Sequence, residues 1–140
     1  MSFIQNSLTR RTVVQAIYRN HFLEAEEFFL EDDFILEKTG NQDLYIKLMK
    51  KCFFLWPFYK NFFKFLCFEE EQRTLIEVSI LKTFISELLI QETDNNILFK
   101  EYLNIANAFC NEEVSVLKVC FNKCVEENIK SKEEDFIHLD

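Results

Sequence analysis

The chain has almost no residues that interrupt a helix. Its 140 residues include a single glycine, Gly40, and a single proline, Pro57. Folds built from strands and tight turns need many such residues, because turns require special backbone angles. This scarcity therefore favours an all-α fold. It also excludes the G-x-G-x-x-G motif and the P-loop as phosphate-binding sites, because both motifs need more than one glycine.

The composition allows one domain with a substantial core. Apolar residues make up 49% of the sequence and 17 residues are phenylalanine, so a disordered chain is not expected. We expect residues 1–130 to form a single helical domain and residues 131–140 to form a charged, frayed C-terminal tail. No uncharged apolar run reaches the length of about 18 residues that a membrane span needs. The odd number of cysteines, with no secretion signal, favours the cytoplasm.

The apolar spacing predicts a compact bundle of about seven helices in two small lobes. The first helix covers about residues 8–21 and a short acidic helix covers about 24–31. The fifth, over about residues 70–90, carries one apolar stripe through Val78 and Ile85 and a second through Ile80 and Phe84. Because a helix that is apolar on most sides must be buried, the fifth helix is predicted to lie at the centre.

Charge is segregated along the sequence. Residues 1–23 contain no acid, and Arg10 and Arg11 begin a helix there, where cations oppose the helix dipole. Residues 24–37 carry acids and no base, and residues 44–68 carry lysines and no acid. The chain as a whole has a formal net charge of −8. A basic N-terminus on an acidic protein indicates a local binding site for a polyanion.

Three stretches of the chain resemble a known family. The run from Val14 to Tyr18 reads V-Q-A-I-Y and is similar to the V-Q-A-L-Y helix that follows arginines in the NusB family of bacterial transcription antitermination proteins. Residues 99–109 resemble the family's I-N-E-A-x-E-L-A-K-x-F run, and residues 72–79 resemble its E-x-A-V-L-R-I-A helix. The chain departs from the family in a late motif, where Lys118 and Val119 replace an asparagine and a glycine.

The resemblance implies a function without catalysis or a cofactor. Proteins of this family bind single-stranded boxA RNA of ribosomal leader transcripts together with the NusE ribosomal protein, as part of an RNA polymerase antitermination complex. By position, the implied RNA-binding residues are Arg10, Arg11, Gln15 and Lys118. The implied partner-binding residues are Gln72, Arg73 and Glu77. Tyr18 also matches the family, and we expect it in the core.

Two other functional interpretations remain open at this stage. The chain could be a helical protein-interaction module without RNA binding, which would agree with its acidity and its few arginines. An enzyme is not expected, because His21 and His138 are the only histidines and neither pairs in an evident way with a nucleophile. Cys120 and Cys124 lie one helical turn apart, and Cys110 could join them around a metal. We expect instead that all three are small buried side chains and that no metal is bound.

Overall fold

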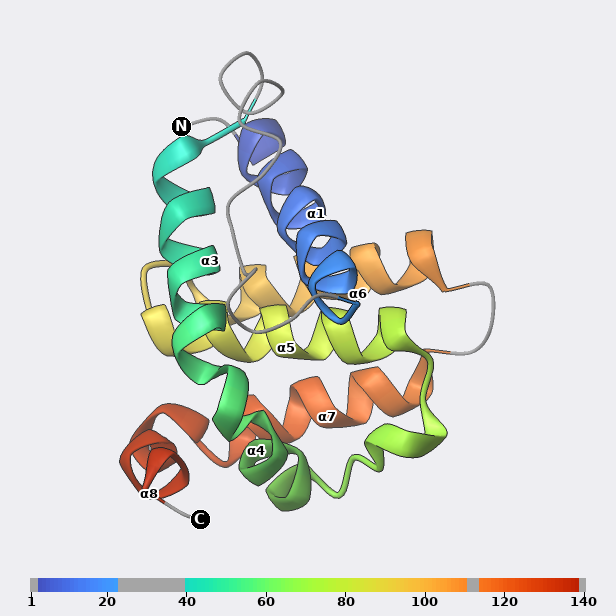
Figure 1. The fold of residues 1–140 in the computed structure, drawn as a ribbon. Coiled ribbons are helices and arrows are strands. Elements are labelled where there is room, and N and C mark those ends of the chain that lie inside the picture. Colours follow the sequence, from blue (N-terminus) through green and yellow to red (C-terminus); the bar gives the residue numbers. More distant parts are fainter. Residues whose placement is uncertain (1–2, 23–39, 111–113, 139–140) are drawn as a thin grey trace.

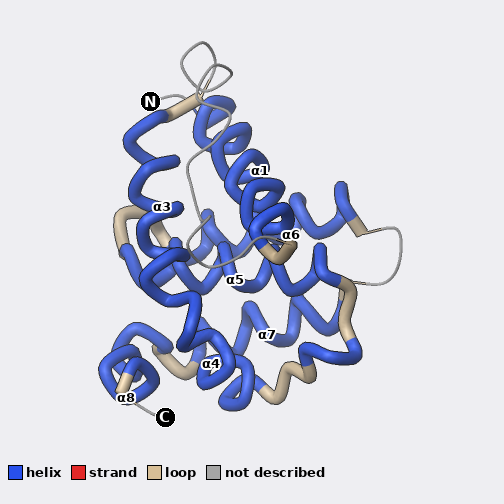
Figure 2. The backbone as a smooth tube through the Cα atoms, viewed as in Figure 1, coloured by secondary structure: helices blue, strands red, loops and turns tan. Residues whose placement is uncertain are grey.

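The computed structural model describes residues 3–22, 40–110 and 114–138, which fold as a bundle of helices without a strand in these ranges (Figures 1 and 2). The predicted all-α fold is confirmed. The α-helices are α1 (Phe3–Asn20), α3 (Gln42–Leu55), α4 (Tyr59–Leu66), α5 (Leu75–Ile90), α6 (Asn95–Phe109), α7 (Ser115–Glu126) and α8 (Glu133–Ile137). Short 3-10 turns cover Trp56–Phe58, Glu70–Gln72 and Ile129–Lys132. The helix expected over about 24–31 lies outside the described residues.

Side-chain caps set the starts of three helices. The side chain of Asn41 accepts from the backbone N–H of Leu44 before α3, and Asp94 accepts from the backbone N–H of Asn96 at the start of α6. Thr74 and Glu77 form a reciprocal capping box at the start of α5. Because of this cap, α5 begins at Leu75, and the predicted start near residue 70 is wrong. Residues 70–72 form a separate 3-10 turn.

Helix α5 lies at the centre of the bundle, as its sequence predicts. Figure 1 shows α1 and α3 on one side of α5 and α7 on the other, and α5 packs against α1, α3, α6 and α7. Every residue from Val78 to Leu89 is buried. The helix therefore forms the structural axis against which the other elements align their apolar faces.

The apolar core of the described residues consists of two clusters. The smaller cluster lies between α1 and α3 and contains Val13, Ala16, Ile17, Tyr45, Leu48, Met49 and Cys52. The larger cluster joins α5 to α4, α6 and α7, and it includes the rings of Phe84 and Phe121, which are tilted by 35° with their centroids 4.3 Å apart. Phe53 on α3 belongs to neither cluster and is 53% exposed.

The C-terminal segment is held against the bundle. The ring of Phe136 on α8 is buried against Phe62, with the ring centroids 4.8 Å apart, and against Phe65. The Asn61 side chain donates to the carbonyl of Phe136, and Glu133 accepts from Lys51. The expectation of a frayed tail is therefore wrong for the described residues up to 138, because one aromatic side chain and two polar contacts fix this segment.

The C-terminal end of α1 is anchored by a buried lysine. Lys82 on α5 is 5% exposed, and its ammonium donates to His21 Nε2 over 3.1 Å. The same ammonium lies 3.9 Å from the centre of the Trp56 ring, a cation–π contact. Burial, together with the charge of Lys82, lowers the pKa of His21 to about 4, and burial lowers the pKa of Lys82 to about 8. His21 is therefore neutral at physiological pH and accepts from the lysine.

The buried position of α5 predicts a large effect of a charge at its centre. Ile85→Asp should destabilise the fold by several kcal/mol, comparable to the whole stability of a small domain, because the carboxylate would have no buried partner. Val119→Asp on α7 is the matched control, since Val119 is 63% exposed. Thermal unfolding followed by circular dichroism measures both. Equal melting temperatures for the two variants would show that α5 is not central.

The environment of His21 predicts a loss of stability in mild acid. The unfolded chain takes up a proton at His21 near its ordinary pKa of 6.5, whereas the folded protein resists protonation down to about pH 4. Stability should therefore fall between pH 6.5 and 4, by about 1–3 kcal/mol from this group. The test compares urea unfolding of the parent and of His21→Gln across this range. The free energy of unfolding of His21→Gln should change less with pH over this range than that of the parent. An equal pH dependence in the two proteins would contradict this explanation.

Candidate functional site

Arg10 does not lie on the surface. Its guanidinium is 2% exposed and forms two hydrogen bonds to Glu87, from Nε and Nη2, each 2.8 Å long. Its Nη1 donates to Glu101 over 2.8 Å. The hydroxyls of Tyr102 and Ser7 donate to oxygens of the same two carboxylates. Burial opposes the charge on Arg10, but the bonds and charge of Glu87 outweigh it and raise the arginine pKa.

This placement corrects the expectation that Arg10 is a surface RNA contact. Arg10 lies where α1 meets α5 and α6, and the buried carboxylates of Glu87 and Glu101 require a cation there. A sequence signal for this network was present. Both glutamates fall within predicted apolar helix faces, beside Leu88 and Tyr102 respectively, where an acid needs a buried partner.

The next residues of the predicted set form an exposed stripe on α1. Arg11 and Gln15 are exposed and lie one helical turn apart. Tyr18 is 38% exposed, so the expectation that it is a core residue is wrong. Its ring makes an edge contact with Phe22, which is 65% exposed, with the centroids 5.5 Å apart. The N-terminal helix therefore presents a cation, an amide and two aromatic rings to solvent.

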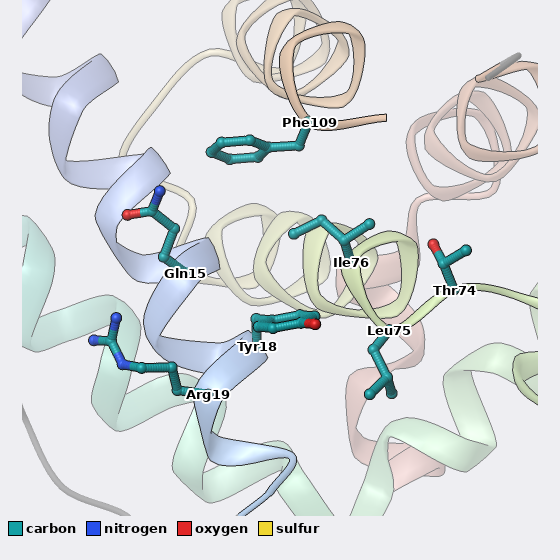
Figure 3. Close-up of a pocket in the computed structure, with 7 residues that line it drawn as sticks. All are labelled: Gln15, Tyr18, Arg19, Thr74, Leu75, Ile76 and Phe109. Atoms are coloured by element: carbon teal, nitrogen blue, oxygen red, sulfur yellow. The ribbon is translucent and has the colours of Figure 1, made fainter. Parts of the chain in front are cut away.

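This stripe borders a groove of about 750 Å³ between α1, the start of α5 and the end of α6 (Figure 3). The groove is lined by Gln15, Tyr18, Arg19, Thr74, Leu75, Ile76 and Phe109. In Figure 3, the Phe109 ring extends from the end of α6 toward Gln15, and the Tyr18 ring lies between α1 and Ile76. Tyr18 and Phe109 thus supply aromatic surface on two sides of one hollow.

The predicted partner-binding residues lie at the start of α5, at the edge of this groove. Gln72 is exposed in the 3-10 turn before α5. Arg73 and Glu77 form an ion pair of 3.6 Å, and Glu77 also accepts from the backbone N–H of Thr74 as part of the helix cap. Glu77 therefore has a local structural role. This set is adjacent to the groove, because Thr74, Leu75 and Ile76, which lie between Arg73 and Glu77 in the sequence, line it.

Lys118 stands apart from the other predicted RNA-binding residues. It is exposed on α7, a helix that packs against α5 and α6. The structure thus divides the predicted RNA-binding set into a buried residue, Arg10, an exposed pair, Arg11 and Gln15, and a separate surface lysine. The groove itself was not predicted, because it forms only where α1, the start of α5 and the end of α6 meet.

The cysteines of α7 point into the core. Cys120 and Cys124 are both buried, and burial raises the pKa of Cys120 to about 11 and that of Cys124 above its ordinary value. Metal binding needs the thiolate form, which such burial disfavours. Over the ranges 3–22, 40–110 and 114–138, no three His, Cys, Asp or Glu side chains come together in a group that could hold a metal. No helix in these ranges is long and apolar enough to cross a membrane.

Compared with protein-family models, with curated proteins and with solved structures, the chain gives no significant match. The functional assignment therefore depends on the residues and on their geometry.

Two adjacent arginines should differ sharply in their contribution to stability. Arg10→Met would leave the carboxylates of Glu87 and Glu101 buried without their cation and should cost about 3–5 kcal/mol. Arg11→Met, at an exposed position, should change stability by less than about 0.5 kcal/mol. Urea unfolding of the two variants is the measurement. Equal effects would show that the buried network is absent in solution.

Proposed function

We propose that this chain binds single-stranded RNA along the exposed stripe of α1 and the groove beside it. The observation that carries the proposal is the meeting of Tyr18, Phe109 and Gln15 in one hollow next to Arg11. Proteins recognise unpaired bases by stacking them on aromatic rings and by hydrogen bonds to their edges, while cations hold the phosphates. The groove offers the aromatic rings and the amide, and Arg11, one helical turn before Gln15 on α1, offers the cation.

The charge distribution supports this location. Residues 1–23 contain no acid, so α1 itself carries no carboxylate that would repel a phosphate. The acids that approach α1 from α5 and α6, Glu87 and Glu101, are buried and paired with Arg10. The carboxylates of Glu87 and Glu101 therefore do not compete with a phosphate for contact with Arg11.

The proposal extends to the function that the sequence resemblance implies. We propose that the RNA is boxA-like and that the chain acts with the NusE ribosomal protein in an RNA polymerase antitermination complex. With a net charge of −8, the chain alone should bind RNA weakly. A basic protein docked at the start of α5, near Gln72 and Arg73, would enlarge the positive surface beside the groove. We therefore expect tight RNA binding only in the presence of the partner.

The groove also supports an alternative function. Leu75 and Ile76 give it an aliphatic side, and Leu75 is 38% exposed. Such a surface also fits a helix or loop of another protein. The chain would then be a protein-interaction module without RNA binding. A measurement of its affinity for RNA distinguishes the two functions.

The experiment measures binding of a boxA-like RNA to the chain with the NusE protein. Tyr18→Ala should weaken RNA binding about tenfold, since stacking one base contributes about 1–3 kcal/mol. Arg11→Glu should weaken binding of all RNA sequences and reduce its salt dependence. Lys64→Glu is the control, because Lys64 is an exposed lysine on α4.

Binding of the chain to the NusE protein without RNA is measured in parallel. If Tyr18→Ala and Arg11→Glu bind RNA as tightly as the parent while the partner is bound, the α1 stripe is not the RNA site. If the partner binds but no RNA affinity appears in any variant, the protein-interaction function is the correct one.

A further inference from the structure

A second surface, on the outer side of α3, has no role in the function proposed above. It consists of Lys47, Lys50, Lys51 and Phe54 on α3 and of Ile90 at the end of α5, which together line a shallow hollow of about 470 Å³. The three lysines and Phe54 follow the i, i+3, i+4, i+7 spacing of a single helix face. We call this set the α3 surface. Phe54 is 50% exposed there, so the hollow has an apolar floor that solvent reaches.

Two of its lysines already hold glutamates of this chain. Lys47 Nζ contacts both carboxylate oxygens of Glu92, at 2.9 and 3.0 Å. Lys51 Nζ contacts Glu133 at 2.7 Å. In both pairs a carboxylate lies at the border of the hollow against a lysine of α3. The geometry of the α3 lysines is therefore suited to carboxylates.

Lys50 lies on the same face between these two pairs and is exposed. Among the contacts given by the described residues, it has no hydrogen bond or ion pair. Lys50 is thus the lysine of the α3 surface whose ammonium can bind an external anion. It lies next to the apolar side chains of Phe54 and Ile90.

We propose that the α3 surface binds an acidic, amphipathic peptide segment of a partner protein. A carboxylate of the segment pairs with Lys50, and a bulky apolar side chain one helical turn away enters the hollow against Phe54 and Ile90. Binding combines a charge contact with burial of an aromatic ring that is otherwise half exposed. The site is distinct from the α1 groove and is independent of RNA binding.

The same contacts disfavour nucleic acid and anionic lipid. Glu92 and Glu133 neutralise two of the three lysines and place carboxylates beside the hollow. A polyanion with a charge on every phosphate would be repelled by them, whereas a peptide can present a single carboxylate to Lys50. The side chains that line the hollow include no amide or hydroxyl that could read a base edge.

The test uses a fluorescein-labelled synthetic peptide whose only charged residue is one glutamate, with a leucine and a phenylalanine one helical turn from it, titrated with the full chain and followed by fluorescence anisotropy. A second peptide with serine in place of leucine and phenylalanine has the same charge and no anchor. We expect saturable binding of the first peptide and none of the second. Lys50→Glu and Phe54→Ser should each weaken the affinity about tenfold.

Lys64→Glu and Phe53→Ser are the matched controls, because both residues are exposed and neither lines the hollow. They should bind the first peptide as the parent does. Circular dichroism of all four variants establishes that each one is folded.

The proposal is overturned if the apolar peptide does not bind, or if Lys50→Glu and Phe54→Ser bind it unchanged. Oligouridine and vesicles of phosphatidylglycerol are tested in the same way. If either binds the parent, loses affinity in the Lys50→Glu variant, and is not displaced by the peptide, the α3 surface is a site for phosphate-bearing polymers or membranes and the peptide proposal is wrong.

Discussion

The buried contact of Arg10 with Glu87 and Glu101 joins α1, α5 and α6 and fixes how α1 is rotated in the bundle. Three charged groups in the interior are tolerated only because nearly every polar atom has a partner, and the hydroxyls of Tyr102 and Ser7 complete the set. Successive residues of a helix point about 100° apart. With Arg10 turned inward, Val13, Val14 and Ile17 share its buried face, and Arg11 begins the exposed stripe of α1.

This rotation creates the surface that the proposed function uses. Gln15 and Tyr18 follow Arg11 along the outer side of α1 and meet the ends of α5 and α6 at the groove. Glu87 and Glu101 are buried and paired with Arg10, so the buried network has an electrostatic as well as a structural effect. The outer side of α3 offers a different chemistry. Two of its three lysines, Lys47 and Lys51, pair with glutamates, and the three lysines border an apolar hollow.

Much of the fold could be predicted from sequence, because it follows from patterns that act over one helix at a time. The shortage of glycine and proline indicated the all-α class, and the nearly continuous apolar surface of residues 75–90 indicated the central helix. The roles of Arg10 and Arg11 were not separated in this way, because Tyr18, which lies on the same face as Arg11, was expected in the core although it is 38% exposed. Their difference depends on glutamates more than 70 positions away. The docking of α8 depended likewise on one residue, Phe136, in a segment that is otherwise charged.

The most direct test of this account is the solvent exchange of the arginine side-chain Nε–H groups, measured by nuclear magnetic resonance on the ¹⁵N-labelled protein at neutral pH. The Arg10 Nε–H donates to Glu87 in the interior, so its signal should be protected from exchange and should vanish or shift in an Arg10→Lys variant. The Arg11 signal should exchange rapidly. If both exchange at the same rapid rate, Arg10 is not buried, and the orientation of α1 on which the proposed RNA surface depends is wrong.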